Sequence, residues 1–178
     1  SQDLKTKEDS IKFANTLKTL NEKDPKNDMV FSQLAAVLQA LGDKDGASKL
    51  IESRLALNPN DYSALALKAQ NAMNAATQDP ALYDVAIENF KKAIAIKPND
   101  DALIYTYLAF SINAKAAACQ NANEQKALCQ ESVTYLEKAR ELDPNRERAN
   151  WTYPLYQCYY TLYGADDART KEIEALTK

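Results

Sequence analysis

Apolar side chains recur at helical spacing along most of the chain, and four of these amphipathic stretches stop shortly before a proline, at Pro25, Pro59, Pro98 and Pro144. Proline cannot continue a helix and restrains the residue before it, so each one predicts a helix end followed by a new start. Three Gly and few β-branched residues are present, and no strand is expected. The pattern predicts an all-α chain of about nine helices.

The first interval, from Pro25 to Pro59, is 34 residues long. Within it, large and small apolar residues alternate on two helical stripes, with Gly42 at the turn between them. This pattern resembles the tetratricopeptide repeat (TPR), W-x2-L-G-x2-Y, then A-x3-F, then P. The matching residues are Phe31, Leu34, Ala35, Leu38, Ala47, Ile51 and Pro59. The resemblance implies a right-handed α-solenoid of stacked antiparallel helix pairs.

The resemblance extends over nearly the whole chain and predicts a single domain, residues 1–178. The later repeats are longer than the first, and Asp79 is expected to cap a helix that begins at Pro80. The longest insertion, around residues 116–126, predicts a protruding helical hairpin with its tip at 121–123. The expected parts are an N-terminal helix (3–24), repeat 1 (28–61), repeat 2 with a short insertion (62–100), repeat 3 with the hairpin insertion (101–147) and repeat 4 (148–178).

Composition and charge exclude several classes of function. The 178-residue chain has a net charge of −3 and no His. The absence of His removes the commonest general base and the usual zinc ligand. We therefore expect no enzyme activity, cofactor or metal site. No Lys/Arg cluster is present, so nucleic acid is not expected as a partner. No stretch reaches the roughly 20 apolar residues of a membrane-spanning helix.

The TPR resemblance implies a concave groove, lined by the first helix of each pair, that binds a protein or peptide. The expected groove residues include no Lys or Arg, so a clamp for a C-terminal carboxylate is not expected. Five Tyr lie between positions 153 and 163, and helical spacing places about half of them in the core. A structural, self-associating piece of a longer solenoid is the alternative function. The candidate binding residues are Gln70, Asn74, Tyr107, Phe110, Tyr153, Tyr156 and Tyr160.

The three cysteines provide an indication of the cellular compartment. Cys119 and Cys129 flank the expected hairpin tip and face each other if the turn lies near residue 124, which makes them a candidate disulfide. Two free thiols are the alternative, and Cys158 is expected as a small core residue. A disulfide favours export to a bacterial periplasm; otherwise the protein is expected to be cytoplasmic. The pairs Asp100-Asp101 and Asp166-Asp167 are expected to cap helices.

Overall fold

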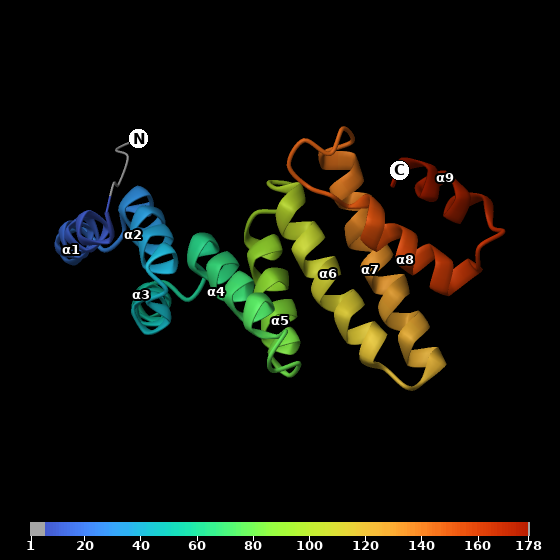
Figure 1. Cartoon of the computed structure of the whole chain (residues 1–178), viewed down its shortest axis with the longest axis horizontal. Coiled ribbons are helices and arrows are strands. Elements are labelled where there is room, and N and C mark those ends of the chain that lie inside the picture. The colour runs from blue at the N-terminus through green and yellow to red at the C-terminus, as the bar shows by residue number, and fades with distance from the viewer. Residues whose placement is uncertain (1–5, 178) are drawn as a thin grey trace. The chain divides into compact units, whose positions relative to one another are not determined.

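The computed structural model describes residues 6–177, and this part of the chain forms nine helices and no strand (Figure 1). Each of the four prolines that predicted a helix end lies two residues beyond the last residue of a helix. The helices are α1 (Lys7–Lys23), α2 (Asp28–Ala40), α3 (Lys44–Leu57), α4 (Tyr62–Ala75), α5 (Leu82–Ile96), α6 (Ala102–Ala118), α7 (Ala122–Leu142), α8 (Thr152–Tyr163) and α9 (Ala168–Leu176).

The chain divides into two compact units, Ser1–Leu67 and Lys68–Lys178, with the boundary inside α4. The sequence-based division into one domain with four repeats stays a prediction, although helix bounds follow the expected repeat ends closely. The N-terminal helix was expected over residues 3–24 and is described over Lys7–Lys23. Residues 1–5 lie outside the described part of the chain.

The first unit packs α1, α2 and α3 around one apolar core. Large residues of α2 such as Phe31, Leu34 and Leu38 are almost fully buried, and the small residues Ala35 and Ala47 let the helices approach. Gly42, between α2 and α3, has a positive φ of 71°, which a side-chain-bearing residue rarely adopts. The helix pair expected for the first repeat is therefore present.

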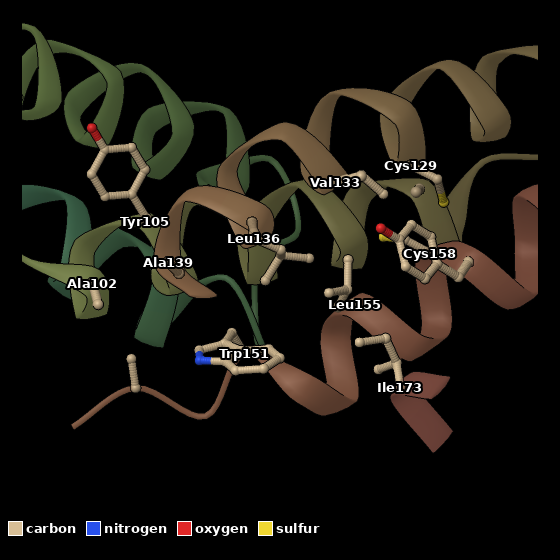
Figure 2. Close-up of a cluster of buried hydrophobic side chains, with 14 residues drawn as sticks. Ala102, Tyr105, Cys129, Val133, Leu136, Ala139, Trp151, Leu155, Cys158 and Ile173 are labelled. Atoms are coloured by element: carbon tan, nitrogen blue, oxygen red, sulfur yellow. The ribbon is translucent and has the colours of Figure 1, made fainter. Parts of the chain in front are cut away.

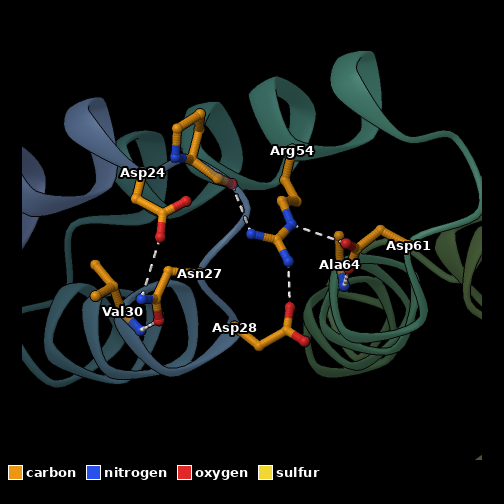
Figure 3. A network of polar contacts seen from close by, with 8 residues as sticks. Asp24, Asn27, Asp28, Val30, Arg54, Asp61 and Ala64 are labelled. Atoms are coloured by element: carbon orange, nitrogen blue, oxygen red, sulfur yellow. Dashed lines mark hydrogen bonds and ion pairs between the residues drawn. The ribbon is translucent and has the colours of Figure 1, made fainter.

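A buried arginine joins three segments of this unit (Figure 3). Arg54, on α3, is 6% exposed; its Nε donates to Asp61 Oδ2 at 2.8 Å and its Nη1 donates to the carbonyl oxygen of Pro25 at 2.6 Å. The guanidinium also pairs with Asp28 and lies over the Phe31 ring, 5.2 Å from its centroid. Asp61 Oδ1 accepts the amide N–H of Ala64 at 3.0 Å, so the same carboxylate caps α4.

The second unit contains two apolar clusters. One joins α4, α5 and α6 through residues such as Ala72, Phe90 and Leu108. The other joins α6, α7, α8 and α9 around Trp151 and Leu155, both at most 1% exposed (Figure 2). Because α6 contributes to both clusters, it is the central helix of this unit.

The predicted hairpin is present as the antiparallel pair α6–α7, but its turn lies earlier than expected. The α6 helix ends at Ala118, and α7 begins at Ala122. Asn121 is the N-cap, and its side-chain oxygen accepts the amide N–H groups of Asn123 and Glu124. The expected tip at 121–123 is therefore wrong, because the Asn121 cap starts α7 directly after it.

The helix start near Asp79 was also predicted too early. Asp79 Oδ1 accepts the amide N–H of Ala81 at 3.2 Å, but α5 begins only at Leu82, after a separate turn. The acidic caps expected elsewhere are confirmed. Asp101 accepts the amide N–H of Leu103 at the start of α6, and Asp167 accepts that of Arg169 at the start of α9.

Removing the buried arginine should destabilise the first unit. Arg54→Ala leaves the Asp61 carboxylate, whose side chain is only 10% exposed, without its cation. We expect a loss of about 3 kcal/mol in the free energy of unfolding, measured by urea denaturation followed by circular dichroism. Asp28→Ala is the matched control: the Asp28 side chain is 74% exposed, so a loss below about 1 kcal/mol is expected. Equal losses in the two variants would contradict this account.

Candidate protein-binding surface

Aromatic side chains form a row on each of two neighbouring helices. On α6, Tyr107 and Phe110 are three residues apart, and residues at this spacing are neighbours on a helix surface. On α8, Tyr153, Tyr156 and Tyr160 follow at intervals of three and four. The rings of Tyr156 and Tyr160 lie 6.1 Å apart between centroids, at a tilt of 47°.

Asn113 joins the two helices that carry these rows. Its Nδ2 donates to the carbonyl oxygen of Pro154 at 3.0 Å, and the Cys158 Sγ lies 3.0 Å from its Oδ1. Asn113 continues the row of Tyr107 and Phe110 by three more residues. Phe110 and Tyr153 therefore both lie within about one helical turn, or 5.4 Å along the axis, of the contact between α6 and α8.

Three side chains of these rows are markedly exposed. Phe110 is 49% exposed, Tyr153 57% and Tyr160 53%, while Tyr156 between them is half-buried. We call Phe110, Tyr153, Tyr156 and Tyr160 the aromatic surface. Large aromatic rings are normally the most buried part of a helix, so exposing three of them on adjoining helices leaves apolar area available to a partner.

Tyr107 was predicted in the same set but is engaged differently. Its ring packs on Phe90 of α5, with the centroids 6.2 Å apart, and it is half-buried against the cluster of α4, α5 and α6. Tyr107 therefore takes part in the packing of α6 on α5, and it contributes little exposed apolar area to the aromatic row of α6.

The other two tyrosines of α8 are engaged with neighbouring side chains. Tyr159 is 8% exposed and its hydroxyl donates to Glu137 Oε1 on α7 at 2.5 Å. Tyr163 packs on Tyr159, and the Arg169 guanidinium lies 3.5 Å from the centroid of the Tyr163 ring. Of the five tyrosines, Tyr153 and Tyr160 are thus exposed, Tyr159 is buried, and Tyr156 and Tyr163 are half-buried.

The two amides predicted with the aromatic residues lie elsewhere. Gln70 is half-buried and Asn74 is exposed, both on α4, where the Asn74 carbonyl oxygen accepts the Thr77 hydroxyl at 3.1 Å. They do not form part of the aromatic surface, which is confined to α6 and α8. The polar residue beside the aromatic surface is instead Asn113, which joins α6 to α8. Spacing along the sequence does not reveal this contact between helices.

The two helices that carry the aromatic surface contain almost no charge. No residue of α8 carries a formal charge, and Lys115 is the one charged residue of α6. Its ammonium group is paired with Asp84 Oδ1 of α5 at 2.7 Å. Near the buried Tyr159, Arg140 of α7 contacts Glu137 of α7 and Glu172 of α9. The surface therefore favours uncharged ligands.

The predicted disulfide between Cys119 and Cys129 is not formed, and all three cysteines are free. Because the hairpin turns at 119–121, Cys119 caps α6, and its Sγ donates to the Asn121 carbonyl oxygen. Cys129 lies seven residues beyond the start of α7, roughly 10 Å along its axis, too far for a disulfide. The argument for an exported protein that rested on this pair is therefore lost.

Searches of the described residues give no sign of two other kinds of site. Among residues 6–177, no group of three or more His, Cys, Asp or Glu could hold a metal ion. Within the same part of the chain, no helix combines the length and apolar character needed to span a membrane.

Comparison with solved structures identifies the fold. The crystal structure of MamA matches with a TM-score of 0.66 at 17% identity, over 96% of this chain and 92% of that chain. TTC0263, a thermophilic TPR protein of Thermus thermophilus, matches with a TM-score of 0.59 at 24% identity, over 84% of this chain and 74% of that one. The chain therefore has the all-α solenoid fold of TPR proteins, as its repeats predicted.

A further structural match is the human IFIT1 dimer with PPP-AAAA, with a TM-score of 0.65 at 20% identity. It covers 90% of this chain and 34% of IFIT1, so this chain spans about a third of that protein's length. No protein-family model matches the chain, and no curated protein matches it in sequence. The likeness is thus one of fold.

An exposed and a buried tyrosine of α8 should respond differently to truncation. Tyr153→Ala removes an exposed ring and should change the free energy of unfolding by less than about 0.5 kcal/mol. Tyr159→Ala removes a buried ring and its hydrogen bond to Glu137, and should cost about 3 kcal/mol. Urea unfolding followed by the fluorescence of Trp151, the single tryptophan, measures both. A large loss in Tyr153→Ala would place that ring in the core instead.

The buried tyrosine also predicts a loss of stability in alkali. Burial, followed by the hydrogen bond to Glu137, raises the pKa of Tyr159 above its ordinary value of about 10. A raised folded pKa stabilises the folded chain below the unfolded pKa, and this contribution declines as the pH rises above about 10. Tyr159→Phe should therefore lose less stability than the wild type between neutral pH and pH ~11, in urea unfolding followed by circular dichroism. Identical losses would contradict the assignment.

Proposed function

We propose that the chain is a non-catalytic scaffold that binds a peptide segment of a partner protein on its aromatic surface. The observation that carries this proposal is the exposure of Phe110, Tyr153 and Tyr160, on two helices that Asn113 holds together. Tyr suits such a surface because its ring buries apolar area while its hydroxyl stays hydrogen-bonded. The TPR fold supports the proposal, because stacked helix pairs create extended surfaces for binding.

The apolar area of the aromatic surface indicates how much of it a partner must cover to bind. A half-exposed aromatic ring leaves on the order of 100 Å² to be buried, so three rings contribute roughly 7 kcal/mol before the costs of association. Those costs are about 4–15 kcal/mol. A partner that contacts only one helix would therefore bind very weakly. Measurable affinity requires a segment that covers the rows of both α6 and α8.

The charge distribution specifies the chemistry of the partner. No charged residue of α8 and no unpaired charge of α6 is available to bind a carboxylate or a phosphate. Apolar and uncharged polar side chains, such as those of Leu, Pro or Gln in a peptide, match the surface best. We expect their binding to depend little on salt, because no ion pair contributes.

Nucleic acid is the contrasting ligand, because the solved IFIT1 dimer contains PPP-AAAA. Phosphate contacts come mainly from Lys and Arg, and they make affinity fall steeply with salt. The aromatic surface offers neither residue, so we do not expect it to bind an oligonucleotide. Self-association, the alternative function, would also hide these rings, in a second copy of the chain.

A displayed library of random peptides, selected against the folded chain, tests the proposal. We expect enriched peptides rich in uncharged apolar residues, and the best one should be synthesised and titrated. The double variant Phe110→Ala/Tyr153→Ala should bind it at least about tenfold more weakly. A change of salt from about 50 to about 500 mM should alter the affinity of the wild type less than about twofold.

The matched control is Met29→Ala/Leu57→Ala, which removes two exposed apolar side chains from α2 and α3. It should bind the peptide as the wild type does. If both double variants bound the peptide equally weakly, the binding would be nonspecific hydrophobic association, and the assignment of the aromatic surface would be refuted. Salt-sensitive binding of an oligoadenylate probe that requires the same rings would favour nucleic acid. Light scattering that shows dimers dependent on Phe110 and Tyr153 would favour self-association.

A further inference from the structure

The exposed side of α8 is a single stripe of three residues. Tyr153, Gln157 and Tyr160 are exposed, and every other residue from 152 to 163 is buried or half-buried. Residues spaced by four and then by three positions lie on one face of a helix. The two rings at the ends of the stripe are therefore about 10.5 Å apart along the helix axis. A partner that lies along α8 meets a ring, an amide and a ring in that order.

Gln157 carries the amide between the two rings. Its backbone carbonyl oxygen accepts the Thr161 hydroxyl at 2.9 Å, a local contact within the helix. Its side-chain amide has no hydrogen-bonding partner among residues 6–177. A primary amide offers two N–H donors and one acceptor oxygen. The stripe can thus bind a ligand through apolar contacts at its ends and through hydrogen bonds at its centre.

The free amide distinguishes between the backbone conformations that a bound peptide could adopt. A helical peptide satisfies its carbonyl groups internally, so it would offer no backbone acceptor to Gln157. A β-strand obtains its hydrogen bonds from the edge of a sheet, which a helix does not provide. A polyproline II segment has no internal hydrogen bonds, and its carbonyl oxygens are free to accept. The amide therefore favours a ligand in the polyproline II conformation.

The separation of the two rings matches the repeat of that conformation. Polyproline II has three residues per turn and rises about 3.1 Å per residue, so residues i and i+3 lie on one face about 9.3 Å apart. This distance differs from the axial separation of Tyr153 and Tyr160 by only about 1 Å. Aromatic side chains are the usual partners of Pro-x-x-Pro segments. One proline can therefore pack on each ring.

The limited apolar area of the aromatic surface also favours a ligand that is ordered before it binds. Ordering a flexible peptide costs free energy for each residue that becomes fixed. Proline already restricts φ in the free chain, so a proline-rich segment loses less entropy on binding. Proline also carries no charge, which suits two helices that contain almost none.

We propose that the aromatic surface binds an uncharged, proline-rich segment of a partner protein in the polyproline II conformation. Prolines at i and i+3 pack on Tyr153 and Tyr160, and the side-chain N–H of Gln157 donates to a backbone carbonyl oxygen between them. Gln157 is thus the residue that selects a ligand by its backbone conformation. The chemistry of this ligand rests on the proposed function, because it describes the partner of the same surface.

Two synthetic peptides of identical composition test this choice of ligand. Both are acetylated and amidated. One consists of four copies of Pro-Ala-Gln, which places a proline at every third position. The other consists of two copies of Pro-Pro-Ala-Gln-Ala-Gln, in which no two prolines are three residues apart. Isothermal titration calorimetry on the whole chain should show binding of the first peptide and at least about tenfold weaker binding of the second.

Variants of two exposed glutamines separate the hydrogen bond from general effects. Gln157→Ala should weaken the binding of the first peptide about fivefold, through the loss of one hydrogen bond. Gln130→Ala is the matched control, because Gln130 is exposed on α7 and its carbonyl oxygen also accepts a Thr hydroxyl, that of Thr134. It should bind as the wild type does. Circular dichroism verifies that both variants are folded.

Equal affinities for the two peptides, or equal losses in Gln157→Ala and Gln130→Ala, would overturn the proposal. Failure of both peptides, while the peptide from the library still binds through Phe110 and Tyr153, would refute the proline-rich ligand and leave the proposed function standing. If no peptide binds through these rings, both proposals are refuted. A library peptide that lacks proline and becomes helical on binding would identify an amphipathic helix as the ligand instead.

Discussion

The candidate surface depends on one contact, the one that Asn113 makes between α6 and α8. A single amide side chain donates to the carbonyl oxygen of Pro154 and contacts the thiol of Cys158, so it fixes both the position and the rotation of α8 against α6. Buried polar contacts of this kind specify one arrangement of helices where apolar packing alone would tolerate several. This contact joins the two helices that carry the aromatic rows.

A second constraint is that α8 is not clearly amphipathic: its apolar residues are not confined to one face. Aromatic and apolar residues occur all round this helix, so burial alone does not decide which of them face solvent. Two of its tyrosines have charged neighbours: Glu137 accepts the Tyr159 hydroxyl, and Arg169 lies over the Tyr163 ring. Phe110, Tyr153 and Tyr160 have no ion pair or charged contact within the described part of the chain, and the scarcity of charge on their two helices underlies the proposed preference for uncharged peptides.

Local signals account for most of the fold that the sequence could predict. Proline stops and the glycine turns at Gly42 and Gly164 act over a few residues, and the helices end where these residues predict. The hairpin tip was misplaced because Asn121 and Asn123 are both capable N-caps, and only the structure shows that Asn121 takes this role. That small shift was enough to make the predicted cysteine pair wrong.

The features that involve distant residues could not be predicted in the same way. The contact of Asn113 with Pro154 depends on how α6 and α8 pack, and helical spacing carries no information about that. Tyr153 and Tyr160 are exposed, which is compatible with their predicted role, and that role stays a prediction. Gln70 and Asn74 were grouped with them only by analogy between repeats.

The most direct test of the account is to map the bound peptide on the protein by nuclear magnetic resonance. The account predicts that adding the selected peptide shifts the signals of Phe110, Tyr153 and Tyr160, and those of the Asn113 side-chain amide between them. The signals of Met29 and Leu57 should stay in place. Shifts confined to Met29, Leu57 or other residues away from α6 and α8 would contradict the central claim that this surface is where the partner binds.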